Sequence, residues 1–255
     1  GSFDHHGIAA VLALLSVLGL VAADSRRAPV LAALAGAGGL WLNAATQLPV
    51  LAGIALGALA TGAGSAEFWR RWGRWGSAAA FVAYLRAYFP AHLGWRLEVN
   101  HPLYALAWAG GGELLARWRA HRADRRGFAT PRDQAVTGLA LLAVAGPAVA
   151  FFGFARETFV VADPLLWALH ADYIQEFSPL WERFRGADGA ALARLIFVNP
   201  GLFPLLAAAA VFRLRRACPD PDRRARLGLV IAPALLFALL TLKQERWLHI
   251  EVALW

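Results

Sequence analysis

Residues 134–154, QAVTGLALLAVAGPAVAFFGF, are the stretch that decides the fold class of this protein. The stretch has no Asp, Glu, Lys or Arg. At about 1.5 Å per residue, an α-helix of this length matches the thickness of about 30 Å of a bilayer's hydrocarbon core. The stretch predicts a membrane-spanning helix, because a helix satisfies its own backbone hydrogen bonds where lipid cannot.

Seven further apolar stretches of about this kind occur along the chain, separated by proline, glycine and charged residues. Together with 134–154 they predict eight spans, the other seven being 8–23, 29–44, 50–66, 76–89, 103–116, 199–212 and 228–242. The predicted fold is therefore all-α, a polytopic transmembrane helical bundle. Small residues such as Gly53 and Gly57 are expected to let its helices approach closely.

The composition excludes several other classes of protein. Hydrophobic residues make up 59% of the chain, and charged residues only 16%, which excludes an ordinary soluble domain and a disordered chain. The net charge of +8 does not indicate nucleic-acid binding, because the arginines fall between apolar stretches instead of forming a basic stripe. The single cysteine, Cys218, forms no internal disulfide.

The distribution of Lys and Arg between alternate loops predicts the orientation of the bundle. One set of loops, around 26–27, 70–74, 117–132 and 213–226, holds 17 of the 25 basic residues. Because cytoplasmic loops retain positive charge, this set is predicted to be cytoplasmic. The other set is then external, and it includes the long loop 157–198, in which we expect a lid or an interfacial helix.

Polar residues gather at the external ends of several predicted spans. Asp4 and His6, with the distant Glu176, form a mixed oxygen and nitrogen set of the kind that binds a divalent cation. Arg246 follows the last span, where an arginine either binds a phosphate or anchors to lipid headgroups. The turn at 98–102 is either part of such a site or only a helix cap, and it is not included among the predicted site residues.

Three short motifs resemble those of one enzyme family. The motifs are GSFDHHGIA at 1–9, YIQEFSPLW at 173–181 (preceded by Asp163-Pro164) and KQERW at 243–247. The first resembles the second acidic motif of the catalytic subunit of oligosaccharyltransferase, a membrane glycosyltransferase of the GT-C type. The other two resemble the external-loop segment that carries the family's glutamate and the segment that carries its arginine. Their order and their common external placement match the family.

The resemblance implies that residues 1–255 are the transmembrane catalytic core of a longer protein. The family's first acidic motif and its soluble C-terminal domain with a Trp-Trp-Asp motif are expected outside this sequence, so the fragment alone is expected to be inactive. A divalent metal cofactor, Mn²⁺ or Mg²⁺, is expected on Asp4, His6 and Glu176. His6 stands where the family has a carboxylate, and an imidazole suits Mn²⁺ or Zn²⁺ better than Mg²⁺.

By this resemblance, the whole protein transfers a glycan from a polyprenyl (di)phosphate carrier to an acceptor, which in the family is a protein asparagine. Asp4, Glu176 and Arg246 are the expected catalytic residues; Glu176 and Arg246 also bind substrate, with Arg246 on the carrier phosphate. The expected partners are the lipid-linked donor, a protein or other acceptor, and membrane lipid. The expected location is a bacterial inner membrane, with the active site facing the periplasm.

Two alternatives remain open at this point. The first is a GT-C transferase that moves a single sugar from a lipid phosphate to a lipid, glycan or hydroxyl acceptor. The second is a transporter or lipid flippase, which needs ionisable residues near the middle of its spans. The predicted spans contain almost none, and Glu113 is close to the cytoplasmic end of its span, which argues against transport.

Overall fold

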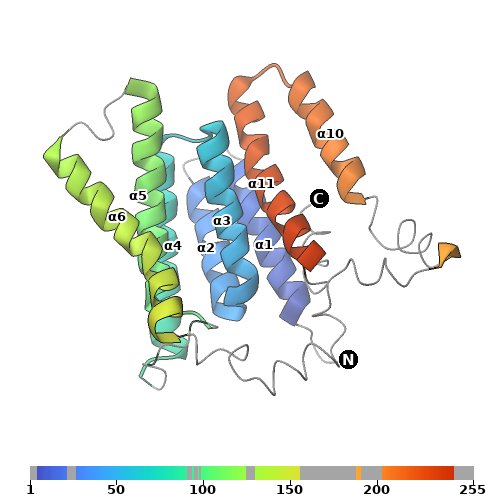
Figure 1. The fold of residues 1–255 in the computed structure, drawn as a ribbon. Helices are drawn as coiled ribbons and strands as arrows, with labels where there is room; N and C mark the ends of the chain where they lie inside the picture. The colour runs from blue at the N-terminus through green and yellow to red at the C-terminus, as the bar shows by residue number, and fades with distance from the viewer. Residues whose placement is uncertain are drawn as a thin grey trace.

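The computed structural model describes residues 5–21, 27–90, 94, 97, 99–124, 130–155, 188–190 and 203–243. Over these residues the protein is all-helical (Figure 1), as predicted. The elements are α1 (His5–Val21), α2 (Ala28–Leu42), α3 (Ala44–Thr61), α4 (Ala66–Ala87), α5 (Pro102–Asp124), α6 (Pro131–Ala150), the π-helical turn η1 (Phe151–Ala155), α10 (Phe203–Ala217) and α11 (Pro221–Lys243).

Each of the eight predicted spans overlaps one of these α-helices, although several boundaries differ. The gap predicted at 45–49 is wrong, because only Asn43 separates α2 from α3. The Asn43 side chain accepts a hydrogen bond of 3.1 Å from the Thr46 backbone N–H and so caps α3. The helix α4 begins at Ala66 instead of 76, because Ser65 caps it and the Glu, Arg and Trp residues that follow continue the helix.

The helices run alternately up and down, so their ends meet in two groups (Figure 1). One group contains the ends of α1, α3, α5 and α10 and the starts of α2, α4, α6 and α11. We call it the arginine-rich end, because the described arginines there are Arg27, Arg70, Arg71, Arg74, Arg117, Arg119, Arg122, Arg132, Arg213, Arg216, Arg223, Arg224 and Arg226. The other group is called the opposite end.

Glycines allow close packing at two helix pairs. A Cβ added at Gly53 of α3 would lie 2.4 Å from the Pro233 Cα of α11, and one added at Gly57 would lie 2.5 Å from the Gly228 carbonyl oxygen. The expected packing role of Gly53 and Gly57 is therefore confirmed. The helices α4 and α5 approach closely at Gly73 and Gly112 in the same way.

Two described helices are long and apolar enough to cross a membrane, namely Ala44–Thr61 (α3) and Pro131–Gly153 (α6 with part of η1). The helices α1 and α2 contribute shorter apolar stretches, Gly7–Val21 and Ala28–Leu42. Large apolar side chains are exposed on several helices, including Leu31, Val82, Leu142 and Leu239. The outer surface of the bundle is therefore apolar over much of its described length.

Candidate functional site

The residues predicted to form the active site lie mainly outside the described residues. Asp4, Glu176 and Arg246 are not described, and of the loop 157–198 the structure describes only 188–190. His6 belongs to α1, but its side chain is not described. Within the part of the chain that is described, no group of three or more His, Cys, Asp or Glu residues is arranged to hold a metal ion. The metal site therefore stays a prediction.

The helices that adjoin the three motifs do reach the same end of the bundle. The helix α1 begins at His5, η1 finishes at Ala155 and α11 finishes at Lys243, all toward the opposite end (Figure 1). The helix α10, which follows the long loop, starts at Phe203 and runs from that side toward the arginine-rich end. In addition, α1 and α11 are neighbours in the bundle although they are far apart in the sequence.

Hydrogen bonds hold the turn before α5 in place. The Asn100 side chain is buried, and its Nδ2 donates a hydrogen bond of 2.8 Å to the Ala80 carbonyl of α4. His101 Nδ1 accepts a hydrogen bond of 3.2 Å from the Leu103 backbone N–H, and the Tyr104 hydroxyl donates one to the Leu97 carbonyl. Of the two interpretations open for this turn, these contacts favour the helix cap.

The position of His101 also affects its charge. Burial lowers the pKa of the imidazole below its ordinary value of 6.5, because the charged form loses hydration. The ring lies 6.2 Å from the Tyr84 ring, with the planes at 62°. A neutral imidazole at pH 7 keeps Nδ1 able to accept the hydrogen bond that caps α5.

Ion pairs at the arginine-rich end connect three helices. Glu113 of α5 accepts a hydrogen bond of 3.0 Å from Arg70 of α4, and it forms an ion pair with Arg117 of its own helix, whose Nε lies 2.8 Å from the carboxylate. The Arg117 guanidinium also contacts the Asp133 carboxylate of α6 at 2.9 Å and the Asp133 carbonyl at 3.0 Å. Glu113, expected near one end of its span, therefore serves to join helices, which accounts for its charge without a transport pathway.

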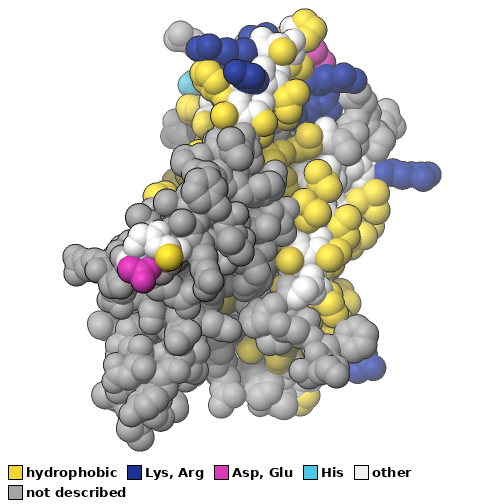
Figure 2. Space-filling model, turned by 90° about the vertical axis from the view of Figure 1, so that its right-hand side faces the viewer, with side chains coloured by type: hydrophobic (Ala, Val, Ile, Leu, Met, Phe, Trp, Pro, Cys, Tyr) yellow, Lys and Arg dark blue, Asp and Glu magenta, His cyan; other side chains and the backbone are white. Residues whose placement is uncertain are grey.

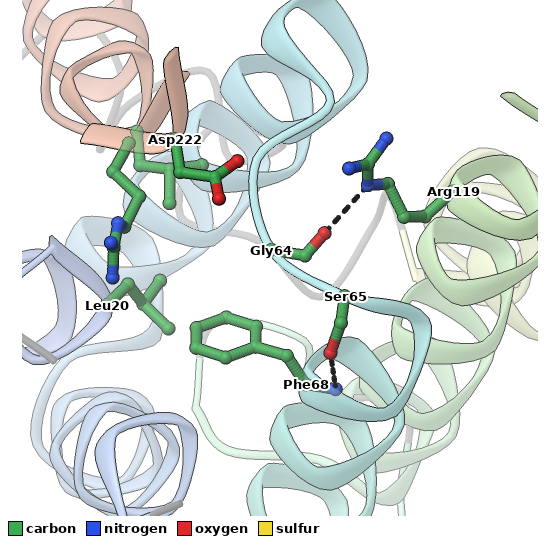
Figure 3. Close-up of a pocket in the computed structure, with 8 residues that line it drawn as sticks. Leu20, Gly64, Ser65, Phe68, Arg119 and Asp222 are labelled. Carbon is green, nitrogen blue, oxygen red and sulfur yellow. Dashed lines mark hydrogen bonds between the residues drawn. The ribbon is translucent and has the colours of Figure 1, made fainter. Parts of the chain in front are cut away.

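A polar cavity at the arginine-rich end was not predicted from the sequence. It has a volume of about 260 Å³ and lies between α1, the start of α4, the last turns of α5 and the first turns of α11 (Figure 3). We call it the arginine cavity. It is lined by Leu20, Gly64, Ser65, Phe68, Arg119, Asp222, Arg226 and Leu229.

The tight turn between α3 and α4 shapes one wall of the arginine cavity. Gly62 and Gly64 have φ values of 68° and 76°, a conformation that glycine adopts without steric cost. This turn presents the Gly64 carbonyl to Arg119, whose Nε donates to it at 2.9 Å (Figure 3). The Ser65 side chain accepts from the Phe68 backbone N–H at 3.1 Å and so caps α4.

The sequence carried no signal for this cavity beyond its arginines, which the charge count used only to predict orientation. Arg119 and Arg226 belong to α5 and α11, and no periodicity relates the two helices. Only the packing of the bundle brings them to one cavity.

A comparison of this chain with protein-family models, with curated proteins and with solved structures finds no match.

Proposed function

We propose that the protein is an integral membrane glycosyltransferase of the GT-C type. In this proposal it transfers a glycan from a polyprenyl (di)phosphate carrier to an acceptor, with protein asparagine as the acceptor class that the resemblance to oligosaccharyltransferase suggests. The observation that carries the proposal is the convergence at the opposite end of the helices that adjoin all three motifs.

The polytopic membrane arrangement is supported by the surface of the bundle. Leu142 of α6 is 71% exposed and Phe152 of η1 is 74% exposed, which is costly in water when many such side chains lie together. Figure 2 shows Lys and Arg side chains gathered at the top, the arginine-rich end, with hydrophobic side chains below them. This is the arrangement expected of a bundle whose arginine-rich end faces the cytoplasm of a bacterial cell.

In the proposed mechanism, Asp4, His6 and Glu176 would hold the divalent ion, which would supply a positive charge to polarise the reacting groups. Glu176 accepts a hydrogen bond from the acceptor amide and so orients it. Arg246 donates two parallel hydrogen bonds to the carrier phosphate and neutralises its negative charge as it leaves. The loop 157–198 closes over the bound substrates and excludes water.

The test of the proposed activity uses the full-length protein with a lipid-linked glycan donor and an acceptor peptide. We expect Asp4→Ala and Glu176→Gln to reduce turnover by at least a hundredfold while the protein still folds, because each removes a ligand of the metal. The matched control is His5→Ala, which changes a neighbouring imidazole and should retain most of the activity. Full turnover in excess chelator contradicts the metal-dependent mechanism.

The arginine offers a second, graded test. Arg246→Lys keeps the charge but loses the planar pair of donors, whereas Arg246→Ala loses both, so donor affinity should fall in that order. Acceptor affinity should change much less. If the acceptor peptide is never modified but a lipid or free sugar is, the single-sugar GT-C alternative replaces the transfer to protein.

The proposed orientation has its own test in intact cells. Cys218 lies between α10 and α11 at the arginine-rich end. An impermeant thiol reagent should therefore not label Cys218 in closed cells, but should label Ser178→Cys in a variant that lacks Cys218. The reverse labelling pattern contradicts the orientation.

A further inference from the structure

The hairpin formed by α10 and α11 carries a cluster of arginines that the proposed mechanism does not use. The helix α10 finishes at Ala217 and α11 begins at Pro221, so the two helices are joined by the turn 218–220 at the arginine-rich end (Figure 1). Among the described helices, α10 packs mainly on α11 and lies at the outside of the bundle. We call residues 212–224 the hairpin tip.

One face of α10 at the hairpin tip combines an aromatic ring with two guanidiniums. Arg216 follows Phe212 by four residues and Arg213 by three, so the three side chains share one face of the helix. The Cζ atom of Arg216 lies 4.2 Å from the centroid of the Phe212 ring. All three residues are exposed. An exposed guanidinium that rests on an apolar ring is suited to the boundary between lipid headgroups and acyl chains.

Two arginines of α11 belong to the same tip. Arg224 donates two hydrogen bonds to the Cys218 carbonyl, from Nε at 3.2 Å and from Nη2 at 2.7 Å, which places its guanidinium beside the end of α10. Arg223 is 73% exposed, and its Nε lies 3.9 Å from the Asp220 carboxylate. The four exposed arginines of the tip, set against Asp220 and Asp222, leave a net charge of +2 among the side chains described there.

The exposed surface of the tip extends around α10. Phe212 and Leu214 are two residues apart, which corresponds to about 200° around a helix, yet they are 54% and 60% exposed. A protein partner covers one face of a helix, whereas lipid surrounds it. The tip also lies where the predicted spans 199–212 and 228–242 meet charged residues, which is the depth of the headgroups in a membrane. These features favour lipid over an acidic protein as the partner.

We propose that the hairpin tip binds the headgroups of anionic phospholipids in the leaflet at the arginine-rich end. This site depends on the membrane location in the proposed function, but not on glycosyl transfer. Clusters of arginines beside a membrane-spanning helix attract anionic lipids through their charge. The arginines contact the phosphates, while Phe212 and Leu214 contact the apolar layer below them. The bound lipids stabilise the position of α10, whose main contact among the described helices is α11.

The experiment measures which lipid lies beside the tip when the full-length protein is reconstituted in bilayers. The protein carries Ala217→Cys and Cys218→Ser in a background without other cysteines, and a fluorophore is attached to the introduced thiol at this exposed position. The bilayers are equal mixtures of phosphatidylglycerol and phosphatidylcholine, one of which bears a nitroxide quencher on its acyl chain. We expect phosphatidylglycerol to be enriched about fivefold beside the label, the factor for roughly one arginine near an anionic surface. High salt should reduce this enrichment.

Variants show whether the arginines of the tip select the lipid. We expect the double variant Arg213→Gln with Arg216→Gln to lose most of the enrichment, because it removes the net positive charge of the tip. Arg213→Lys with Arg216→Lys retains the charge and should keep most of the enrichment. The matched control is Arg27→Gln with Arg132→Gln, which removes two exposed arginines from the same end of the bundle, at the starts of α2 and α6. The control should leave the enrichment at the label unchanged.

Equal quenching by the two lipids, or an equal loss in the control and in the tip variant, overturns the inference. A lysine variant that loses as much enrichment as the glutamine variant also overturns it, because the selection then does not follow charge. Extraction of the wild-type protein from membranes by alkaline carbonate contradicts the membrane location instead. A protein that stays in the membrane and transfers glycans, but does not enrich phosphatidylglycerol at the tip, contradicts the lipid site alone, so the two proposals fail separately.

Discussion

The helices α3 and α6 have similar composition but opposite surroundings. Both are long and apolar enough to cross a membrane, and α6 is the more hydropathic of the two. Yet 44% of the residues in the apolar stretch of α3 are buried inside the protein, against 11% in that of α6. Hydropathy therefore indicates that a helix avoids water, but not whether protein or lipid covers it.

The difference comes from a few side chains on each helix. The helix α3 has Gly53 and Gly57 against α11 and a buried Gln47 bonded to Ser16 of α1, so it packs on several sides. The helix α6 packs mainly on α5, where Ala140 lies against Gly110, and an ion pair fixes its first turn. Small residues and specific polar contacts thus distinguish the central helix from the peripheral one.

The largest expected effect is on α6 and tests whether lipid covers it. Leu142, near the middle of this helix, is 71% exposed, so Leu142→Lys in water would change stability little. In a bilayer, a central lysine costs about 3 kcal/mol of insertion free energy relative to leucine. We expect the inserted fraction of α6 to fall strongly in a glycosylation-reporter assay. Gln134→Lys, at the start of the same helix, should insert normally, and equal insertion of both variants contradicts a lipid-facing α6.

The next largest effect is expected for a substitution in α3, where the change in free energy should be nearly as large. In Gly53→Val, the added side chain meets the backbone of Pro233, which cannot move away without shifting α11. We expect a loss of about 3 kcal/mol in the free energy of unfolding, at the upper end of the range for overpacking. The measurement is thermal unfolding in detergent. Gly138→Val on α6 is the control, because a Cβ there meets nothing within 4 Å; similar losses for both variants would remove the distinction between the two helices.

An intermediate effect is expected at the ion pair that holds α6. Arg117→Leu leaves the Glu113 and Asp133 carboxylates without the guanidinium that joins them. The arginine side chain is only 9% exposed, so the loss should exceed that of a surface pair and be about 2 kcal/mol. Arg71→Leu breaks the exposed pair with Glu67 and should change unfolding less. A cysteine crosslink between α5 and α6 should restore the stability of Arg117→Leu. If it does not, the loss in the free energy of unfolding does not come from the contact between these two helices.

The smallest effect is expected at the polar contact of α3 with α1. Gln47 Nε2 donates a hydrogen bond of 3.2 Å to Ser16 Oγ, while Gln47 Oε1 is buried and has no partner among the described residues. Ser16→Ala leaves the amide without this acceptor and should cost about 1 kcal/mol. Gln47→Leu removes the unpaired oxygen as well and should cost less. The comparison uses the same unfolding assay, and a larger loss in Gln47→Leu would indicate that Oε1 has a partner, such as a buried water molecule.

The positions of the helices, and the close approach of helices at Gly53 and Gly57, could be read from the sequence, because both depend on local residue type; the helix that these glycines meet could not. Apolar stretches predicted the eight α-helices that the structure describes, and charge clusters predicted the end of the bundle at which each of them begins or finishes. Their exact bounds could not be read in the same way, as α4 shows, because Ser65 starts the helix ten residues before the apolar stretch, and charged residues continue it. The motif residues Asp4, His6, Glu176 and Arg246 were singled out by their residue types at the predicted external ends of the spans, their roles came from the resemblance, and they remain predictions.

What the sequence by itself determined is therefore the helical class, the alternation of the helices and the side on which the arginines gather, since each of these follows from the hydropathy and charge of neighbouring residues. Only the tertiary structure decided that α3 is central and α6 peripheral, and that Arg119 and Arg226 line the same cavity. The physical reason is that packing partners are selected by shape, through glycines and buried polar contacts between distant segments, and hydropathy carries no information about which segments will meet.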